Sequence, residues 1–289
     1  MRTRDLRNGL LFISPWIIGF VVFVAYPLIS SLYYSFTQYN MISPPQWIGI
    51  ANYVSLFHDQ DFLISLWNTG YMIVIGLSFI TVAAIALAML LNNKKIRGTG
   101  VVFSLIFVPQ LVPVVVLSIL WIWILQPGSG VLNIILGWIG IHGPGWISNP
   151  YWAKPGFIVM FLWSSGNVVL IYLAGLQGIS PSLYEAASLD GAGSFQKAIH
   201  VTLPLLRPVI LFNVITGMIG IFQTFAQSFI MTDGGPANST LFYSLYLYQN
   251  AFSYFRMGYA SAMAWILLLI VLSLTVLILL FTNQFNTES

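Results

Sequence analysis

The chain has 289 residues, of which 58% are hydrophobic and only 6% are charged, with 10 Lys and Arg against 7 Asp and Glu. A typical soluble domain carries about 25% charged residues, so this chain cannot cover a water-facing surface. With no Cys and only 3 scattered His, a soluble metalloenzyme is excluded. The basic residues lie in short clusters beside apolar runs, a pattern typical of membrane topology signals and not of nucleic-acid binding.

Six charge-free stretches are long enough to cross a bilayer, because a span needs about 20 apolar residues. They are residues 10–36, 63–91, 99–125, 156–178, 208–231 and 257–282. A further apolar piece, residues 131–141, is too short to span, so we expect an interfacial or re-entrant segment there. The predicted fold class is an all-α integral membrane protein, with residues 1–289 forming one transmembrane domain of six helices.

The orientation is predicted from Lys and Arg, which favour the cytoplasmic side. The first apolar run is too long for a signal peptide and lacks an Ala-x-Ala exit, so it is interpreted as the first span. If the spans alternate, only Lys154 and Arg256 fall on the outer side. We therefore expect both termini to be cytoplasmic. The remaining basic residues all fall on the inner side: Arg2, Arg4, Arg7, Lys94, Lys95, Arg97, Lys197 and Arg207.

The two longer outer loops, residues 37–62 and 126–155, are rich in Trp, Pro and Gly, which predicts an ordered outer cap. In the first of them, His58, Asp59 and Asp61 could form a cation site. A solvated loop before a helix is the simpler interpretation, because a carboxylate is favourable near a helix N-terminus. The cation interpretation is therefore not adopted.

The longest predicted cytoplasmic connection, residues 179–207, has a helical pattern of its own. Pro181 suits a first helical position, and Ser182 with Glu185 fits a capping box. We expect a short helix that ends near Leu189.

The second half of this connection contains a helix breaker at residues 190–193, in which Gly191 permits a turn with positive φ. A second short helix capped by Ser194 is expected to run through His200 and to end before Leu203-Pro204. On composition alone this helical hairpin is either a plain connector or a docking element for a partner protein.

Two sets of short strings indicate a known family. The first set is Glu185-Ala186-Ala187, Asp190-Gly191-Ala192 and Thr202-Leu203-Pro204-Leu205-Leu206. It resembles the EAA loop of permease subunits in binding-protein-dependent ABC importers. The second set resembles the carbohydrate-uptake branch, and most closely the first permease subunit of maltose-type systems. It consists of Phe36-Thr37 with Tyr39-Asn40, Asn52-Tyr53, Trp67-Asn68-Thr69, Leu132-Asn133, Leu173-Ala174-Gly175-Leu176-Gln177, Thr232 with Gly234-Gly235-Pro236, and Gly258-Tyr259-Ala260-Ser261-Ala262.

The resemblance implies a heterodimer of two six-span permeases in a bacterial plasma membrane, with two cytoplasmic ATPase subunits and an external solute-binding protein. It also implies that the EAA hairpin is a coupling helix seated in the ATPase. The sequence has no phosphate-binding loop with the required spacing, so ATP and Mg²⁺ are expected on the partners and no cofactor, metal or catalytic residue is expected in this chain. The coupling role is carried onto Glu185, Ala186, Ala187, Asp190, Gly191, Leu203 and Pro204.

A saccharide path needs amide or hydroxyl groups beside aromatic rings. The fifth span has the densest such mixture, with Gln223 and Gln227 four residues apart on one expected helix face and Thr224 adjacent. The fourth span adds Asn167 and Tyr172. Interhelical contacts between two permeases would also explain each of these residues. Since the family places substrate contacts on these two spans, these five residues are the predicted substrate path.

No charged residue falls within a predicted span, which argues against an ion-coupled carrier and favours a neutral saccharide. An anionic sugar is compatible if helix ends or the partner supply positive potential. Two alternatives stay open. The first is an ABC importer of the same type that imports glycerol phosphate or another polyol derivative, and the second is a stand-alone secondary carrier or channel. A membrane-embedded enzyme is disfavoured because all three His lie in predicted loops.

Overall fold

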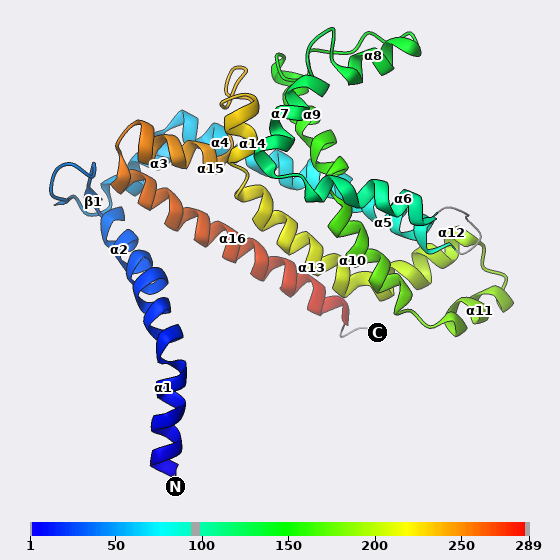
Figure 1. The fold of residues 1–289 in the computed structure, drawn as a ribbon, viewed down its shortest axis with the longest axis horizontal. Helices are drawn as coiled ribbons and strands as arrows, with labels where there is room; N and C mark the ends of the chain where they lie inside the picture. Colours follow the sequence, from blue (N-terminus) through cyan, green and yellow to red (C-terminus); the bar gives the residue numbers. More distant parts are fainter. Residues whose placement is uncertain (1, 94–98, 287–289) are drawn as a thin grey trace. The chain divides into compact units, whose positions relative to one another are not determined.

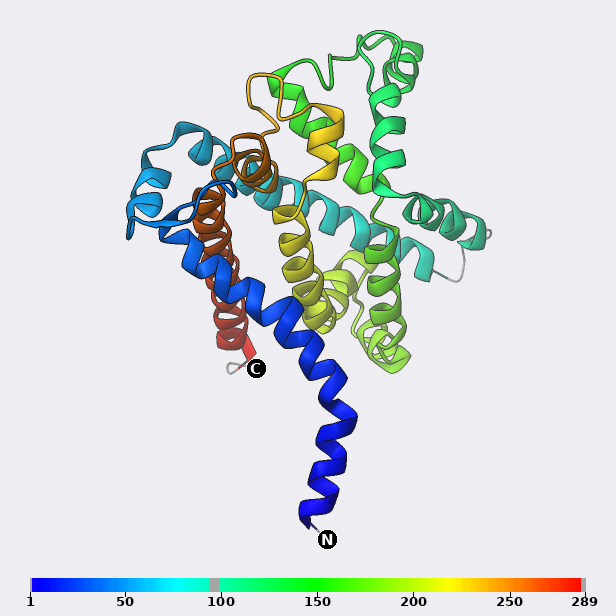
Figure 2. The same cartoon turned by 60° about the vertical axis from the view of Figure 1, so that its left-hand side comes forward.

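The computed structural model describes residues 2–93 and 99–286, and within these ranges it is mostly helical, with one two-stranded sheet (Figures 1 and 2). The chain divides into two compact units. Unit 1 comprises Met1–Gln60 and Leu247–Ser273, and unit 2 comprises Asp61–Tyr246 and Leu274–Ser289. Three basic residues used for the orientation, Lys94, Lys95 and Arg97, lie outside the described residues.

Unit 1 is built from two long helices and the small sheet. Its elements in chain order are α1 (Arg2–Phe20), a π-helical turn (Val21–Ala25), α2 (Tyr26–Ser35), β1 (Thr37–Gln38), β2 (Gln46–Trp47), α3 (Ala51–His58), a second π-helical turn (Gln249–Ser253) and the first part of α16 (Met257–Asn286). The strands pair antiparallel, with Thr37 opposite Trp47 and Gln38 opposite Gln46. Figure 1 shows β1 directly after the end of α2 that is remote from the N-terminus.

Unit 2 contains most of the remaining helices. In chain order they are α4 (Gln60–Tyr71), a π-helical turn (Met72–Leu77), α5 (Ser78–Asn92), α6 (Thr99–Phe107), a 3₁₀ turn (Val108–Leu111), α7 (Val114–Ile124), α8 (Val131–Trp138), α9 (Pro150–Trp163), α10 (Gly166–Gln177), α11 (Pro181–Leu189), α12 (Ser194–Lys197), a π-helical turn (Ala198–Thr202), α13 (Leu203–Phe222), α14 (Ala226–Met231) and α15 (Tyr243–Tyr248). The short α8 falls in the apolar piece that was predicted to be interfacial or re-entrant, and its relation to the membrane stays a prediction.

Among the described residues, four helices are long and apolar enough to cross a membrane: Asn8–Ser35, Gln60–Asn92, Ser194–Phe222 and Met257–Leu280. Two further helix pairs meet the same test together but are bent, by 110° between Gly100–Leu111 and Val114–Ile124 and by 52° between Pro150–Trp163 and Gly166–Gln177. Counting each bent pair as one span gives six, which agrees with the predicted all-helical membrane class. The observed helices extend beyond the predicted charge-free stretches, so they also carry Lys154, Lys197 and Arg207.

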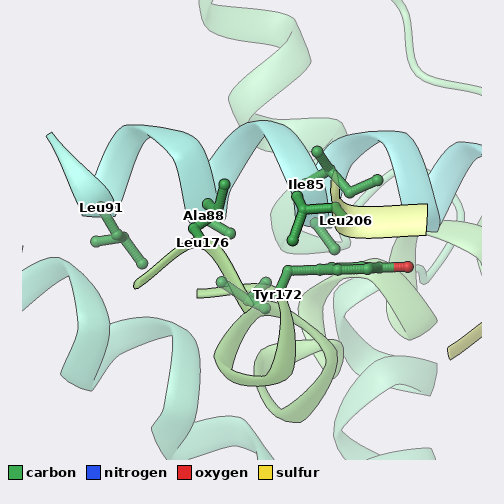
Figure 3. Close-up of a cluster of buried hydrophobic side chains, with 8 residues drawn as sticks. Ile85, Ala88, Leu91, Tyr172, Leu176 and Leu206 are labelled. Atoms are coloured by element: carbon green, nitrogen blue, oxygen red, sulfur yellow. The ribbon is translucent and has the colours of Figure 1, made fainter. Parts of the chain in front are cut away.

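The core of unit 2 lies where α5, α10 and α13 meet (Figure 3). Apolar side chains gain little by leaving lipid for protein, so close contact rather than hydrophobicity must hold such helices together. Small residues permit that contact: an added Cβ at Gly175 of α10 would come within 2.9 Å of Leu206 on α13. The buried cluster consists of Ala84, Ile85, Ala88, Leu91, Val169, Tyr172, Leu176 and Leu206.

A second close contact joins α10 to α6, and its contribution to the stability of the fold can be measured. A Cβ at Gly166 would overlap the backbone carbonyl of Ile106, which cannot rotate away as a side chain can. We expect Gly166→Ala to destabilise the folded protein by about 1–3 kcal/mol, the usual cost of overpacking. The measurement is the thermal unfolding midpoint of the purified protein in detergent. The matched control is Gly70→Ala in α4, where an added Cβ meets nothing within 4 Å. Equal midpoints for the two variants would contradict this packing assignment.

Candidate functional site

Residues 179–207, which contain the EAA strings, are called the EAA segment. Its first half forms α11, which begins at Pro181 and ends at Leu189. Its N-cap is Ser180, not Ser182, so the predicted capping box with Glu185 is wrong. The hydroxyls of Ser180 and Ser182 instead share one hydrogen bond, with their oxygens 2.8 Å apart. The position of the proline decides the start, because its fixed φ is accepted in the first turn and the residue before it is held extended.

The turn after α11 depends on Gly191, which has a φ of +79°. The Gly191 amide donates to the Ser188 carbonyl (3.1 Å), and the Ala192 amide donates to the Ala187 carbonyl (2.9 Å). This pair of bonds is the Schellman arrangement, which satisfies the last carbonyls of a helix and favours glycine at the left-handed position. The predicted breaker is therefore present, and its geometry rests on one residue.

The second half of the segment differs from the prediction. α12 begins at Ser194, but the N-cap is Gly193, whose amide donates to Oε1 of Gln196 (2.8 Å). The helix then continues through the π-helical turn Ala198–Thr202 directly into α13. The expected stop at Leu203-Pro204 is wrong. Pro204 lies inside the continuous helix, directly after the π-helical turn, and such a local adjustment lets a membrane helix tolerate a proline.

Most residues of the predicted coupling set are exposed: Glu185, Ala186, Asp190, Gly191, Leu203 and Pro204, while Ala187 is half-buried. Two apolar side chains that the sequence reasoning did not single out flank the Gly191 turn. Leu189 is 90% exposed and Phe195 is 77% exposed. Large apolar residues at both sides of a polar turn are a signal that could have been found in the sequence, and they mark a surface suited to a protein partner.

The segment is tied to α13 by side-chain hydrogen bonds. The hydroxyls of Tyr184 and Thr202 lie 3.1 Å apart, and Nζ of Lys197 donates to Oγ of Ser188 (2.7 Å). A cavity of about 320 Å³ lies beside the turn, lined in part by Gly191 and His200. Because α12 continues into α13 without interruption, a displacement of the turn can pass into a membrane-crossing helix as a rigid movement.

A second group of polar residues lies at breaks in the helices. α9 ends at Trp163 and α10 begins at Gly166, so the backbone is interrupted at Ser164 and Ser165. Nε2 of Gln110 donates to the Ser164 carbonyl (2.6 Å) and satisfies one of the groups that the break leaves open. Non-helical backbone at membrane depth is tolerated where it is buried in protein or lines a cavity.

A similar break follows α13, which ends at Phe222, while α14 begins at Ala226. Gln223 and Gln227 therefore do not share one face of a continuous helix, and that prediction is wrong. The Phe222 carbonyl accepts a hydrogen bond from Oγ of Ser244 (2.8 Å).

The predicted path residues separate into two groups. Asn167 and Gln223 are exposed and Gln227 is half-buried, and the three side-chain amides have no hydrogen-bond partner among the described residues. Thr224 is 6% exposed and donates to the Gly220 carbonyl at 3.4 Å. Tyr172 is fully buried, and Figure 3 shows its ring against Ile85 and Leu206. The geometry thus assigns Tyr172 to helix packing.

The outer polar residues form structural contacts. Nζ of Lys154 donates to Oδ1 of Asn68 (2.9 Å) and to the Ser239 carbonyl (3.2 Å). Nδ2 of Asn238 donates to Oδ1 of Asp61 (2.9 Å). In the part of the chain that the structure describes, no group of three or more His, Cys, Asp or Glu is placed to hold a metal ion.

A protein-family model matches more than half of the chain. Residues 80–287 match the family described as "Binding-protein-dependent transport system inner membrane component". The matched range contains the whole EAA segment, residues 179–207, and the two predicted spans after it. The chain belongs to this family. The resemblance inferred from the EAA strings is thereby confirmed at the level of the family.

Individual relatives of this inner membrane component are similar over nearly its full length. "Probable ABC transporter permease protein YesP" of Bacillus subtilis (strain 168) is 40% identical over 98% of this chain and 92% of the relative. "Lactose transport system permease protein LacF" of Rhizobium radiobacter is 38% identical over 93% of this chain and 92% of the relative. Among solved structures, a chain of a bacterial ABC transporter involved in the import of the acidic polysaccharide alginate matches with a TM-score of 0.81 and 26% identity, covering 98% of this chain and 99% of that one.

Proposed function

We propose that this chain is the membrane-spanning subunit of an ATP-driven importer and forms, with a second homologous permease subunit, the path for a saccharide. An external solute-binding protein delivers the saccharide. The proposal is supported by membership of a binding-protein-dependent family and by relatives whose names include lactose and arabinooligosaccharide transport. The chain is non-catalytic in this proposal, and ATP with Mg²⁺ is bound by two separate ATPase subunits.

The observation that carries the coupling role is the exposed turn at Gly191, with Leu189 and Phe195 beside it. The two apolar side chains would enter a cleft of the ATPase. Glu185 and Asp190 would face basic residues at its rim, where charge-assisted hydrogen bonds add geometric specificity. Ala186 at the exposed side of α11 permits close approach of the partner backbone.

The proposed transit residues are Asn167, Gln223 and Gln227, with Thr224 holding the backbone beside them. Each amide carries two donors and one acceptor oxygen, which match the hydroxyl groups of a sugar. Their position at breaks in the membrane helices supports this role, because interrupted helices line binding sites in other transporters. Tyr172 supports the path indirectly by fixing α10 against α5.

The same proposal sets both termini and the EAA segment on the cytoplasmic side of a bacterial inner membrane. The first outer loop and the loop before α16 then face the binding protein. The support is the distribution of Lys and Arg, of which only Lys154 and Arg256 fall outside.

The test is reconstitution of the chain with its co-expressed neighbours in nanodiscs, followed by an assay of ATP hydrolysis with the external binding protein and a saccharide panel. We expect hydrolysis to be stimulated by the binding protein loaded with one sugar class. Stimulation only by a polyol phosphate would change the cargo. Purification of the chain alone as an active, ATP-independent carrier would overturn the proposal.

A further inference from the structure

Short strings that lie far apart in the sequence meet at the small sheet of unit 1. Nδ2 of Asn52 donates to the carbonyls of Ser35 and Thr37, at 2.9 Å each. The amide of Gly258 donates to the Tyr39 carbonyl (3.0 Å), and a Cβ at Gly258 would overlap the Thr37 carbonyl. The end of α2, the start of α3 and the start of α16 are therefore fixed to one another around the sheet.

An open pocket of about 390 Å³ lies beside these contacts, and its lining includes Gln38, Asn40, Gln46, Arg256 and Tyr259. Its volume is within the range of small-molecule sites, about 300–1,000 Å³. Gln38 and Gln46 lie directly opposite each other in the antiparallel pair, so they share one face of the sheet. Neither glutamine side chain has a hydrogen-bond partner among the described residues.

The side chain of Asn40 is held in one orientation at the same pocket. Its Oδ1 accepts from the amides of Ile42 (3.1 Å) and Ser43 (2.8 Å), which fixes the orientation of the side chain. That arrangement leaves the Nδ2 group of Asn40 as a donor at the cavity. Three amide side chains therefore present donors and acceptors to one space, as a ligand with several hydroxyl groups requires.

Arg256 gives this cavity a positive charge. Its guanidinium lies 4.2 Å from the centre of the Tyr259 ring, whose hydroxyl donates to Oδ2 of Asp59. The Arg256 guanidinium thus stacks on the face of the Tyr259 ring. The N–H groups of the guanidinium make no hydrogen bond or ion pair within the described ranges. Lys154, by contrast, uses its ammonium for protein contacts.

A planar guanidinium matches a carboxylate in a bidentate pair, and neighbouring amides match the hydroxyls of a sugar ring. We propose that this pocket binds one unit of an acidic saccharide, with its carboxylate at Arg256 and its hydroxyls at Gln38, Asn40 and Gln46. The site rests on the proposed function, under which it faces the outer side of the membrane. An acidic side chain of the binding protein is the other possible occupant, but it would leave the three amides without partners.

The test is direct binding of digalacturonate and of its neutral counterpart galactobiose to the assembled transporter in nanodiscs, without binding protein or nucleotide. We expect digalacturonate to bind about tenfold more tightly, because charge-assisted hydrogen bonds are roughly twice as strong as neutral ones. Arg256→Gln is expected to remove this preference and to leave the affinity for galactobiose unchanged. Gln46→Ala is expected to weaken both ligands. The matched control is Gln126→Ala, an exposed glutamine of another predicted outer loop that does not line the cavity.

Equal affinities for the two disaccharides, or a preference that survives Arg256→Gln, would overturn the pocket assignment. So would an Arg256→Gln variant that loses only stimulation by the binding protein, since that result identifies a protein side chain as the occupant. The proposed function is read separately, from ATP hydrolysis with loaded binding protein. If the parent complex shows no stimulation while Arg256 still selects digalacturonate, the importer assignment fails and the pocket remains.

Discussion

Replacing Gly191 by proline is expected to reduce ATP hydrolysis by the assembled complex from the stimulated to the unstimulated rate, while the chain still folds and inserts into the membrane. Gly191 has a φ of +79°, whereas proline is held near −65°. Proline also removes the amide that donates to Ser188. The turn would therefore point in another direction and displace Leu189 and Phe195. Because Gly191 is exposed, the membrane helices need not rearrange.

The measurement is ATP hydrolysis in nanodiscs with and without loaded binding protein, after co-purification has shown that the complex assembles. Alanine provides a graded comparison. At Gly191 it must adopt a left-handed conformation that costs about 1–2 kcal/mol, so partial loss is expected. At Gly193 the φ is −70° and the nearest atom to an added Cβ is 3.8 Å away, so Gly193→Ala should behave as the parent. Full stimulation in Gly191→Pro, or equal loss in Gly193→Ala, would contradict the coupling assignment.

The helical class could be predicted from the sequence because a membrane allows few alternatives. A chain in lipid must satisfy its backbone hydrogen bonds internally, so long charge-free runs become helices. The helix α11 was also predictable, since Pro181 marks its start and Gly191 marks its turn. Both residues act through their own backbone preferences, which do not depend on distant parts of the chain.

The helix breaks could not be predicted, because the residues at them carry no strong local signal. Ser164 and Gln223 are acceptable in a helix, and neither break contains Gly or Pro between the helix ends. What stabilises them comes from elsewhere in the fold: Gln110 bonds to the Ser164 carbonyl and Ser244 bonds to the Phe222 carbonyl. Conversely, Leu203-Pro204 resembled a helix stop, but the π-helical turn Ala198–Thr202 before it lets the helix continue through the proline.

The pocket of unit 1 also could not be predicted from the sequence, because contacts between distant segments form it. The strings that contain Tyr39, Asn52 and Gly258 indicate a family, but their spacing in the sequence does not predict that they lie in contact. Their proximity follows from the hydrogen bonds of Asn52 and from the missing side chain at Gly258. Gln38 and Gln46 became candidates only through the strand register.

Replacing both Gln223 and Gln227 by alanine is expected to lower saccharide uptake at limiting sugar by about one to two powers of ten, since two hydrogen bonds of about 0.5–1.5 kcal/mol each are lost. Saturating sugar should restore much of the rate if the amides bind the substrate and its transition through the membrane equally. The measurement is uptake of labelled saccharide into proteoliposomes that contain ATP, with binding protein outside. Gln60→Ala, an exposed glutamine at the start of α4, is the matched control.

The competing explanation is that these amides hold two permease subunits together, as polar residues often do between membrane helices. The two roles predict different losses. If the amides are interhelical contacts, the double alanine variant should fail to co-purify with the second permease, and ATP hydrolysis should fall with assembly. If they line the path, assembly should be unchanged and the loss should depend on sugar concentration. Gln223 lies in a helix break, and interrupted helices line the substrate sites of other transporters. We therefore expect unchanged assembly and a loss of uptake that depends on sugar concentration.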